Sequence, residues 1–271
     1  HSGSEIDKKR ANANIVMGRF LYALKQEADY EIISYKGGQK DNAITREAVC
    51  EILVAREDVE AVKASAARAE EGLREEYAGT DGNITVQIAE EGHTEADVLH
   101  PTSREKVLFY LVQVPFGIQK MSGNIEGLVE TSTNIGIVKL SDDEFFASSS
   151  VRSSVEAARD ALSNKIQYLT EFLGGEYEIQ GAYPAWEYRK DSPLRDKMVS
   201  VYEEMYGQKP EVVAIHAGLE CGLFYKKIEG LDCVSLGPNM KGIHTSEEVL
   251  DIASTERVWN YLVKVLEQLK D

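Results

Sequence analysis

The order of strand-like and helix-like segments is the feature that most restricts how this chain folds. Residues 11–29 carry apolar side chains at helical spacing, and residues 30–35 and 48–55 are predicted strands. Residues 56–77 follow as a long, charged, alanine-rich helix. Short links between such segments favour an α+β layer, in which helices cover one face of a sheet.

This pattern continues through the first two thirds of the chain. We expect further strands at residues 83–89, 127–140, 144–152 and 176–180, and further helices at residues 103–113 and 154–173. Residues 1–182 are therefore predicted to form one α+β domain.

The character of the sequence changes at residues 181–194, GAYPAWEYRKDSPL, which contain two prolines and several aromatic residues. Such a stretch indicates a hinge or domain boundary. Beyond it we expect helices at residues 194–206 and 246–269, and short apolar strands at residues 212–215 and 231–236. Fully apolar strands are typical of buried parallel sheets. Residues 183–271 are therefore predicted to be the last strand–helix units of an α/β domain.

Composition limits the partners of the chain. It has 30 Lys and Arg against 46 Asp and Glu, a net charge of −16, which repels phosphate backbones and argues against nucleic acid. No apolar run is long enough to span a membrane. Three cysteines without a Cys-x-x-Cys spacing favour the reducing cytoplasm. The chain begins with His rather than Met, which indicates that it is a piece of something longer.

Two candidate residues lie in the C-terminal part. Glu220 is the one carboxylate within the apolar stretch VVAIHAGLECGLF, where the glycines favour a loop. It either caps the next helix, with its charge on the helix dipole, or meets a ligand cation. His244, within GPNMKGIHTSEE, is either a histidine next to a helix cap or a ligand-binding side chain at the end of a strand. His244 has no partner at metal-ligand spacing in this sequence.

Three more candidates lie in the N-terminal part. Arg152 ends the alternating stretch EFFASSSVR and suits bidentate binding of a carboxylate, although most arginines at strand ends are simply solvated. Asn42, in KGGQKDNAITREA, either stabilises a turn or contributes a polar side chain to a functional site. His1 begins the segment His-Ser-Gly, which is also compatible with an expression scar.

Taken together, six stretches resemble a known family in their order: HSGSEI, GGQKDNAITREA, GLVETSTNIGIV, GAYPAW, IHAGLECGLF and VSLGPNMKGIHTSEE. The sequence is similar to the aminoacyl-histidine (Xaa-His) dipeptidases, relatives of carnosinases and carboxypeptidase G. This resemblance implies an inserted α+β lid, or dimerisation, domain at residues 1–182. Residues 183–271 would be the C-terminal part of the zinc-peptidase α/β domain.

The resemblance also implies a role for each candidate. His244 matches the last metal ligand, and His1 matches a lid histidine that reaches into the partner subunit's site and polarises the scissile carbonyl. Asn42 matches a lid asparagine near the substrate, and Arg152 the arginine that binds the substrate carboxylate. Glu220 would meet the free amino group of a dipeptide.

One departure is Thr45, where many members of the family have proline. Members also carry, before the position of His1, the remaining ligands of two divalent metal ions, with zinc expected. The resemblance therefore implies a cytoplasmic, homodimeric metallo-dipeptidase that hydrolyses Xaa-His and related dipeptides with a metal-activated water.

This chain alone is expected to bind no metal pair and to be inactive. Two alternatives stay open. One is deacylation of N-acyl amino acids by the same kind of site. The other is a non-catalytic dimerisation module that uses a strand edge and the apolar stripe of residues 11–29.

Overall fold

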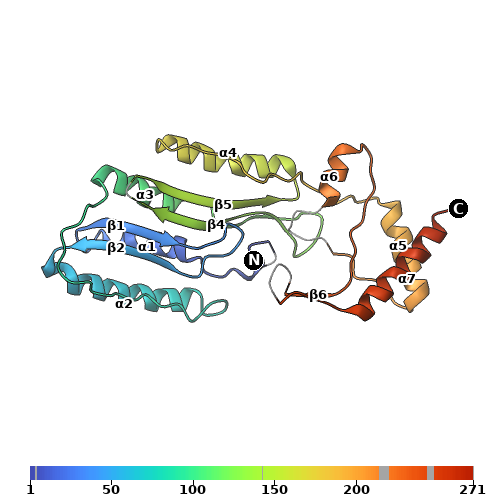
Figure 1. Ribbon diagram of the computed structural model, residues 1–271, viewed down its shortest axis with the longest axis horizontal. Helices are drawn as coiled ribbons and strands as arrows, with labels where there is room; N and C mark the ends of the chain where they lie inside the picture. The colour runs from blue at the N-terminus through green and yellow to red at the C-terminus, as the bar shows by residue number, and fades with distance from the viewer. Residues whose placement is uncertain (4, 142, 214–219, 243–246, 271) are drawn as a thin grey trace. The chain divides into compact units, whose positions relative to one another are not determined.

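The computed structural model describes residues 1–3, 5–141, 143–213, 220–242 and 247–270 (Figure 1). These residues belong to two compact units, one formed by residues 1–181 and the other by the described residues from 182 onward. No helix among them is long and apolar enough to cross a bilayer.

The first unit is built on an antiparallel sheet in which β4 is central. One edge of β4 pairs with β3 along its first half and with β1 near its end, and the other edge pairs with β5. The hairpin partner of β1 is β2. The five strands are β1 (Tyr30–Gly37), β2 (Ala48–Val54), β3 (Gly117–Met121), β4 (Val129–Leu140) and β5 (Phe145–Ser153).

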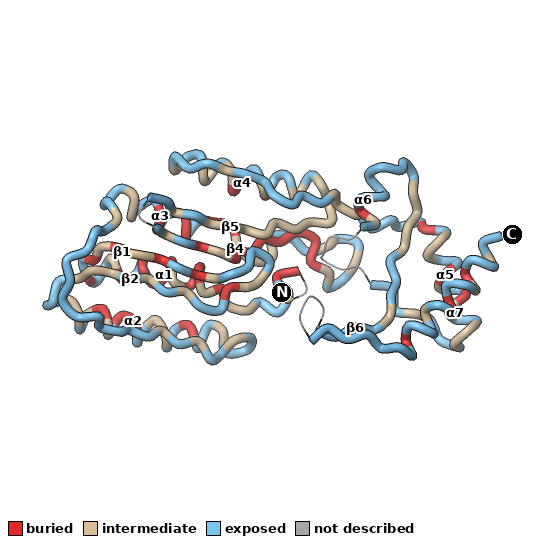
Figure 2. The backbone as a smooth tube through the Cα atoms, in the orientation of Figure 1, coloured by how far each residue is buried: buried red, intermediate tan, exposed pale blue. Residues whose placement is uncertain are grey.

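Helices of the first unit pack onto this sheet. The core joins apolar side chains of α1, α2 and α3 to those of the strands, with Leu24, Leu111 and Ile135 fully buried. Figure 2 shows buried stretches of the backbone along β4. Helix α4 packs against β5. The helices are α1 (Ala13–Leu24), α2 (Val59–Glu76), α3 (Pro101–Gln113) and α4 (Glu156–Phe172), with 3₁₀ turns at Ile6–Lys8 and Arg56–Asp58.

Most elements predicted for this unit are confirmed, but the strand predicted at residues 83–89 is wrong. This stretch has no regular structure and runs along α2. The Glu70 carboxylate accepts from the Val86 amide at 2.8 Å, and the Arg74 guanidinium donates to the Ile84 carbonyl at 2.9 Å. Side chains of α2, not a neighbouring strand, therefore satisfy backbone groups of this segment despite its alternating pattern. Residues 176–180, also predicted as a strand, are irregular and mostly exposed.

The apolar stripe of residues 11–29 is not available to a partner chain. Val16, Phe20, Leu21 and Leu24 of α1 are buried in the core of the first unit. The stripe therefore holds α1 onto the sheet, and the expectation that it offers a dimerisation surface was wrong.

The second unit has a small core between two helices. Met198 and Val201 of α5 pack against Tyr261 and Val265 of α7. The Tyr261 hydroxyl donates to the Met198 carbonyl at 2.7 Å. The elements are α5 (Pro193–Tyr206), α6 (Glu220–Lys227), β6 (Met240–Lys241), β7 (Val249–Leu250) and α7 (Ile252–Gln268).

The apolar strands predicted in the second unit are not found among its described residues. Val212 and Val213 are 53% and 64% exposed and lie outside regular structure, and the remainder of that stretch is outside the described residues. Residues 231–236 are irregular and partly buried. A strand needs a neighbour to satisfy its backbone, and among the described residues of this unit only β6 and β7 pair. The predicted mixture of helices and strands is nevertheless confirmed.

The contact between β4 and the β1–β2 loop gives a test of the fold. A Cβ atom at Gly136 would lie 2.3 Å from the Asp41 carbonyl oxygen, so the backbone must shift if alanine is introduced. We expect Gly136→Ala to lower the free energy of unfolding by about 1–3 kcal/mol. Urea denaturation followed by far-UV circular dichroism measures this change.

Gly72→Ala is the matched control. Gly72 lies within α2, and a Cβ atom there would meet nothing within 4 Å. Because alanine is the better helix former, we expect this variant to gain about 0.5–1 kcal/mol of stability. Equal stability of the two variants would contradict the described contact between Gly136 and Asp41.

Candidate functional site

The loop between β1 and β2 carries Asn42 and lies flat against β4. Gly38 makes this approach possible because its φ of +74° is in the left-handed region, and a Cβ there would lie 1.9 Å from the Gly136 carbonyl oxygen. The Asn42 side chain is exposed, and its backbone amide donates to the Asp41 carboxylate at 2.7 Å. The loop therefore presents Asn42 to solvent from a closely held backbone.

His1 lies beside this loop. The Ser2 amide donates to the Asn42 carbonyl at 2.8 Å, which ties the first residues of the chain to the loop. The Gly3 amide donates to Nδ1 of His1 at 3.1 Å. A neutral imidazole that accepts at Nδ1 carries its proton on Nε2. The exposed edge of His1 is therefore a hydrogen-bond donor.

Arg152 lies on β5 and is half-buried. In the β4–β5 ladder it pairs with Ser132, two residues before Asn134. Its Nε atom is buried and has no hydrogen-bond partner among the described residues. Burial lowers the pKa of the guanidinium, and the nearby Asp41 carboxylate opposes that effect. A partly desolvated cation with unused donor capacity is suited to bind a carboxylate.

The structure thus brings together three of the five predicted site residues. Asn42 and His1 are joined through Ser2. Asn134, which donates to the Asp41 carbonyl, lies two residues from Ser132, the partner of Arg152 in the β4–β5 ladder. This end of the sheet combines an imidazole donor, an amide and a guanidinium, which together can hold the polar groups of a small anionic ligand.

Glu220 is exposed at the start of α6 in the second unit. The prediction of a loop is wrong from this residue onward, because Glu220–Lys227 is helical. Gly222 lies within that helix, and a side chain there would not fit, because a Cβ atom would lie 2.7 Å from the Pro184 carbonyl oxygen. The carboxylate in the first turn has the favourable sign for the helix dipole.

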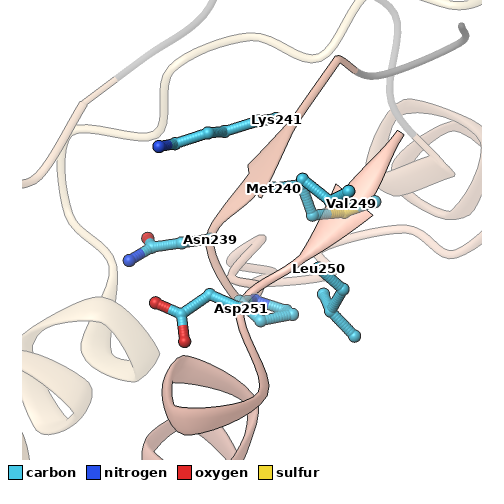
Figure 3. A pocket seen from close by; sticks show the side chains of 7 residues that line it. Asn239, Met240, Lys241, Val249, Leu250 and Asp251 are labelled. Atoms are coloured by element: carbon cyan, nitrogen blue, oxygen red, sulfur yellow. The ribbon is translucent and has the colours of Figure 1, made fainter. Parts of the chain in front are cut away.

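His244 lies outside the described residues. The nearby hairpin of β6 and β7 borders a hollow lined by residues 238–241 and 249–251 (Figure 3). Figure 3 shows Asn239, Lys241 and Asp251 pointing to the same side of this hairpin. Within the described part of the chain, no three His, Cys, Asp or Glu side chains are placed to hold a metal ion. The described residues therefore do not form a metal site by themselves.

Sequence reasoning missed the residues that hold the loop in place. Thr45 is buried, and its hydroxyl donates to the Gly136 carbonyl oxygen at 3.0 Å and accepts from Nδ2 of the Asn14 side chain at 3.1 Å. Asn12 and Asn134 are also fully buried and are hydrogen-bonded to each other at 3.1 Å. The polar run ETSTN within a predicted strand was the available signal, because buried polar side chains need partners.

Comparison with known proteins places the chain in a class. Residues 22–268 match the model of peptidase family M20/M25/M40, and the chain belongs to that family.

Two relatives are similar over nearly all of the chain. It is 32% identical over 269 residues to the cytosol non-specific dipeptidase of Escherichia coli (strain K12), covering 99% of this chain and 55% of that protein. The crystal structure of aminoacylhistidine dipeptidase from Vibrio alginolyticus matches with a TM-score of 0.88 and 33% identity, over 99% of this chain and 55% of that one. The chain thus spans about half the length of the relatives that it matches.

The buried Thr45 hydroxyl gives a second test. Thr45→Val keeps the shape of the side chain but removes one partner each from Nδ2 of the Asn14 side chain and from the Gly136 carbonyl. We expect a loss of about 1–3 kcal/mol in the free energy of unfolding, because buried polar groups are left unpaired. Thr85→Val, at an exposed position, should change stability by no more than about 0.5 kcal/mol. Urea denaturation of both variants measures the difference, and equal effects would contradict the hydrogen-bonded role of Thr45.

Proposed function

We propose that this chain is the substrate-holding part of a metallo-dipeptidase that cleaves Xaa-His and related dipeptides. Residues 1–182 are its lid, or dimerisation, domain, and residues 183–271 the C-terminal part of its catalytic domain. The observation that carries this proposal is the group formed by Arg152, Asn42 and His1, in a chain of family M20/M25/M40.

Arg152 binds the C-terminal carboxylate of the dipeptide. Its partly buried guanidinium gains more from an anion than an exposed one does, because water competes less for the charge. The exposed Asn42 side chain offers an amide to the polar groups of the same ligand.

His1 acts on the scissile carbonyl of that same dipeptide, which lies in the partner subunit's site. The Gly3 amide occupies Nδ1, so Nε2–H is the group that faces the substrate. A donor aimed at the carbonyl oxygen stabilises the negative charge that develops there in the transition state. This role requires a homodimer formed through the lid domain.

Glu220 pairs with the free amino group of the dipeptide, and His244 binds a metal ion. Two divalent ions, with zinc expected, supply an activated water when they are bound in the whole enzyme. The cytoplasm is the proposed location, in line with the cytosolic relative, and neither nucleic acid nor membrane is a partner.

The first test is hydrolysis. Of the metal ligands implied by the resemblance, only His244 falls within this sequence, so we expect the purified 271-residue chain with added zinc to leave dipeptides uncleaved. Chromatographic detection of free histidine from alanyl-histidine measures this. Zinc-dependent release of histidine by the chain would overturn the proposal that it is only the substrate-holding part.

The second test is binding. Titration of the labelled chain by NMR should show weak binding of alanyl-histidine and markedly weaker binding of alanyl-histidine amide, which lacks the carboxylate. Arg152→Ala should reduce the affinity for alanyl-histidine about tenfold or more, because a charge-assisted pair is lost.

Arg68→Ala is the matched control, because it removes the same charge from an exposed residue of α2 that is ion-paired with Glu27. Its affinity for alanyl-histidine should equal that of the wild-type chain. Equal affinities in the two variants would show that Arg152 is not the carboxylate-binding group. N-acetyl-histidine, which has no free amino group, is titrated alongside. Weaker binding than that of alanyl-histidine favours the dipeptidase proposal, and tighter binding favours the deacylase alternative.

A further inference from the structure

The first half of β4 is unusual because its polar side chains are buried. The run Glu130–Asn134 has the sequence ETSTN, and each of its residues is at most 7% exposed. Polar residues at such positions cost free energy unless they are hydrogen-bonded. Each one therefore needs partners, and the partners of Asn134 lead to the candidate site.

The Asn134 side chain uses its amide group fully. Nδ2 donates to the carbonyl oxygens of Ala43 at 2.8 Å and Asp41 at 3.3 Å. Oδ1 accepts from Nδ2 of Asn12 at 3.1 Å, and Asn12 also donates to the Ile135 carbonyl at 2.8 Å. Asn12 is in turn the N-cap of α1. The orientation of the Asn134 amide is thus fixed from the side of the core.

These bonds bracket Asn42. Asn134 holds the carbonyl groups on both sides of it, and the carbonyl of Asn42 itself accepts from the Ser2 amide. The position of His1 next to the loop therefore depends on the same backbone that Asn134 holds. Among the described residues, only the Asn134 side chain donates to the carbonyls of both Asp41 and Ala43.

The register of the sheet relates Asn134 to Arg152. Asn134 pairs with Ser150, and Ser132 pairs with Arg152. Directly opposed residues, and residues two apart on one strand, lie on the same face of a sheet. Asn134 and Arg152 therefore share a face, so the residue that holds the loop belongs to the same rigid ladder as the carboxylate-binding arginine.

We propose that Asn134 is a positioning residue of the substrate site. By holding the carbonyls of Asp41 and Ala43, it sets Asn42 and the His1 segment in a fixed geometry relative to Arg152. This inference rests on the proposed function for its substrate, an Xaa-His dipeptide. The part that concerns how Asn134 holds the loop does not depend on that function. Misplacing binding groups weakens a site even when every group is still present.

The first experiment tests the geometric part. In Asn134→Ala, hydrogen exchange of the Ser2 amide should accelerate about tenfold or more, because its acceptor on Asn42 is no longer held. Amides of the β1–β2 ladder should exchange as in the wild-type chain. Ser150→Ala, which removes only the hydroxyl of the residue paired with Asn134 on β5, should leave the exchange rate of the Ser2 amide unchanged. Unchanged exchange of Ser2 in Asn134→Ala would overturn the proposal.

The second experiment tests the effect on binding. Asn134→Ala should weaken alanyl-histidine binding about tenfold, and should have little further effect in a chain that already carries Asn42→Ala. A merely structural role would lower the affinity by the same factor in both backgrounds. Accelerated exchange of Ser2 with unchanged affinity would also overturn the role in the site.

If the wild-type chain binds no dipeptide, the proposed function fails, and the exchange of Ser2 alone decides the geometric part. If Asn134→Ala does not fold, Asn134→Asp replaces it, because aspartate keeps the acceptor for Asn12 and loses both donors. The hydrogen bonds of Asn134 can also be tested in the wild-type chain, without any substitution. The Nδ2 protons of Asn134 should be protected from exchange, and rapid exchange would overturn the proposal.

Discussion

Strand β4 is the constraint on which the first unit depends. It is the only described strand that pairs with three others, so β1, β3 and β5 are all placed relative to it. Its second half is apolar and enters the core through Ile135 and Val138, whereas its first half is polar and buried. One strand therefore serves two environments. The change between them falls at Asn134 and Gly136, where the β1–β2 loop meets the sheet.

The buried polar side chains at this junction form directional hydrogen bonds. They therefore stabilise one particular arrangement of the loop, which apolar packing alone would not select. Asn12 caps α1 and contacts β4, Asn14 contacts Thr45, and Thr45 contacts the carbonyl of Gly136. Such networks are costly when incomplete, so each member restricts its neighbours. The hydroxyl of Thr45 provides a directed contact to β4, so the loop is held there through hydrogen bonds.

Local pattern was sufficient to predict most of the first unit, because its apolar side chains recur at helix or strand spacing. It failed at residues 83–89, where α2 side chains satisfy the backbone, and at Val212 and Val213, where no strand neighbour is described. Among the site residues, Asn42, Arg152 and His1 were identified by resemblance to a family. The contacts through Ser2 and Asp41 that bring them together depend on long-range register, which a sequence pattern does not contain.

The close approach of Asp41 to Gly136 also limits how this site can diversify. An insertion before Asn42 would displace a backbone that has no free space on the side of β4. For the proposed site, a change of ligand preference is then made by exchanging an exposed side chain such as Asn42 at constant loop length. A combinatorial library aimed at new specificities would accordingly randomise that position and keep residues 38–41 and 136 as they are.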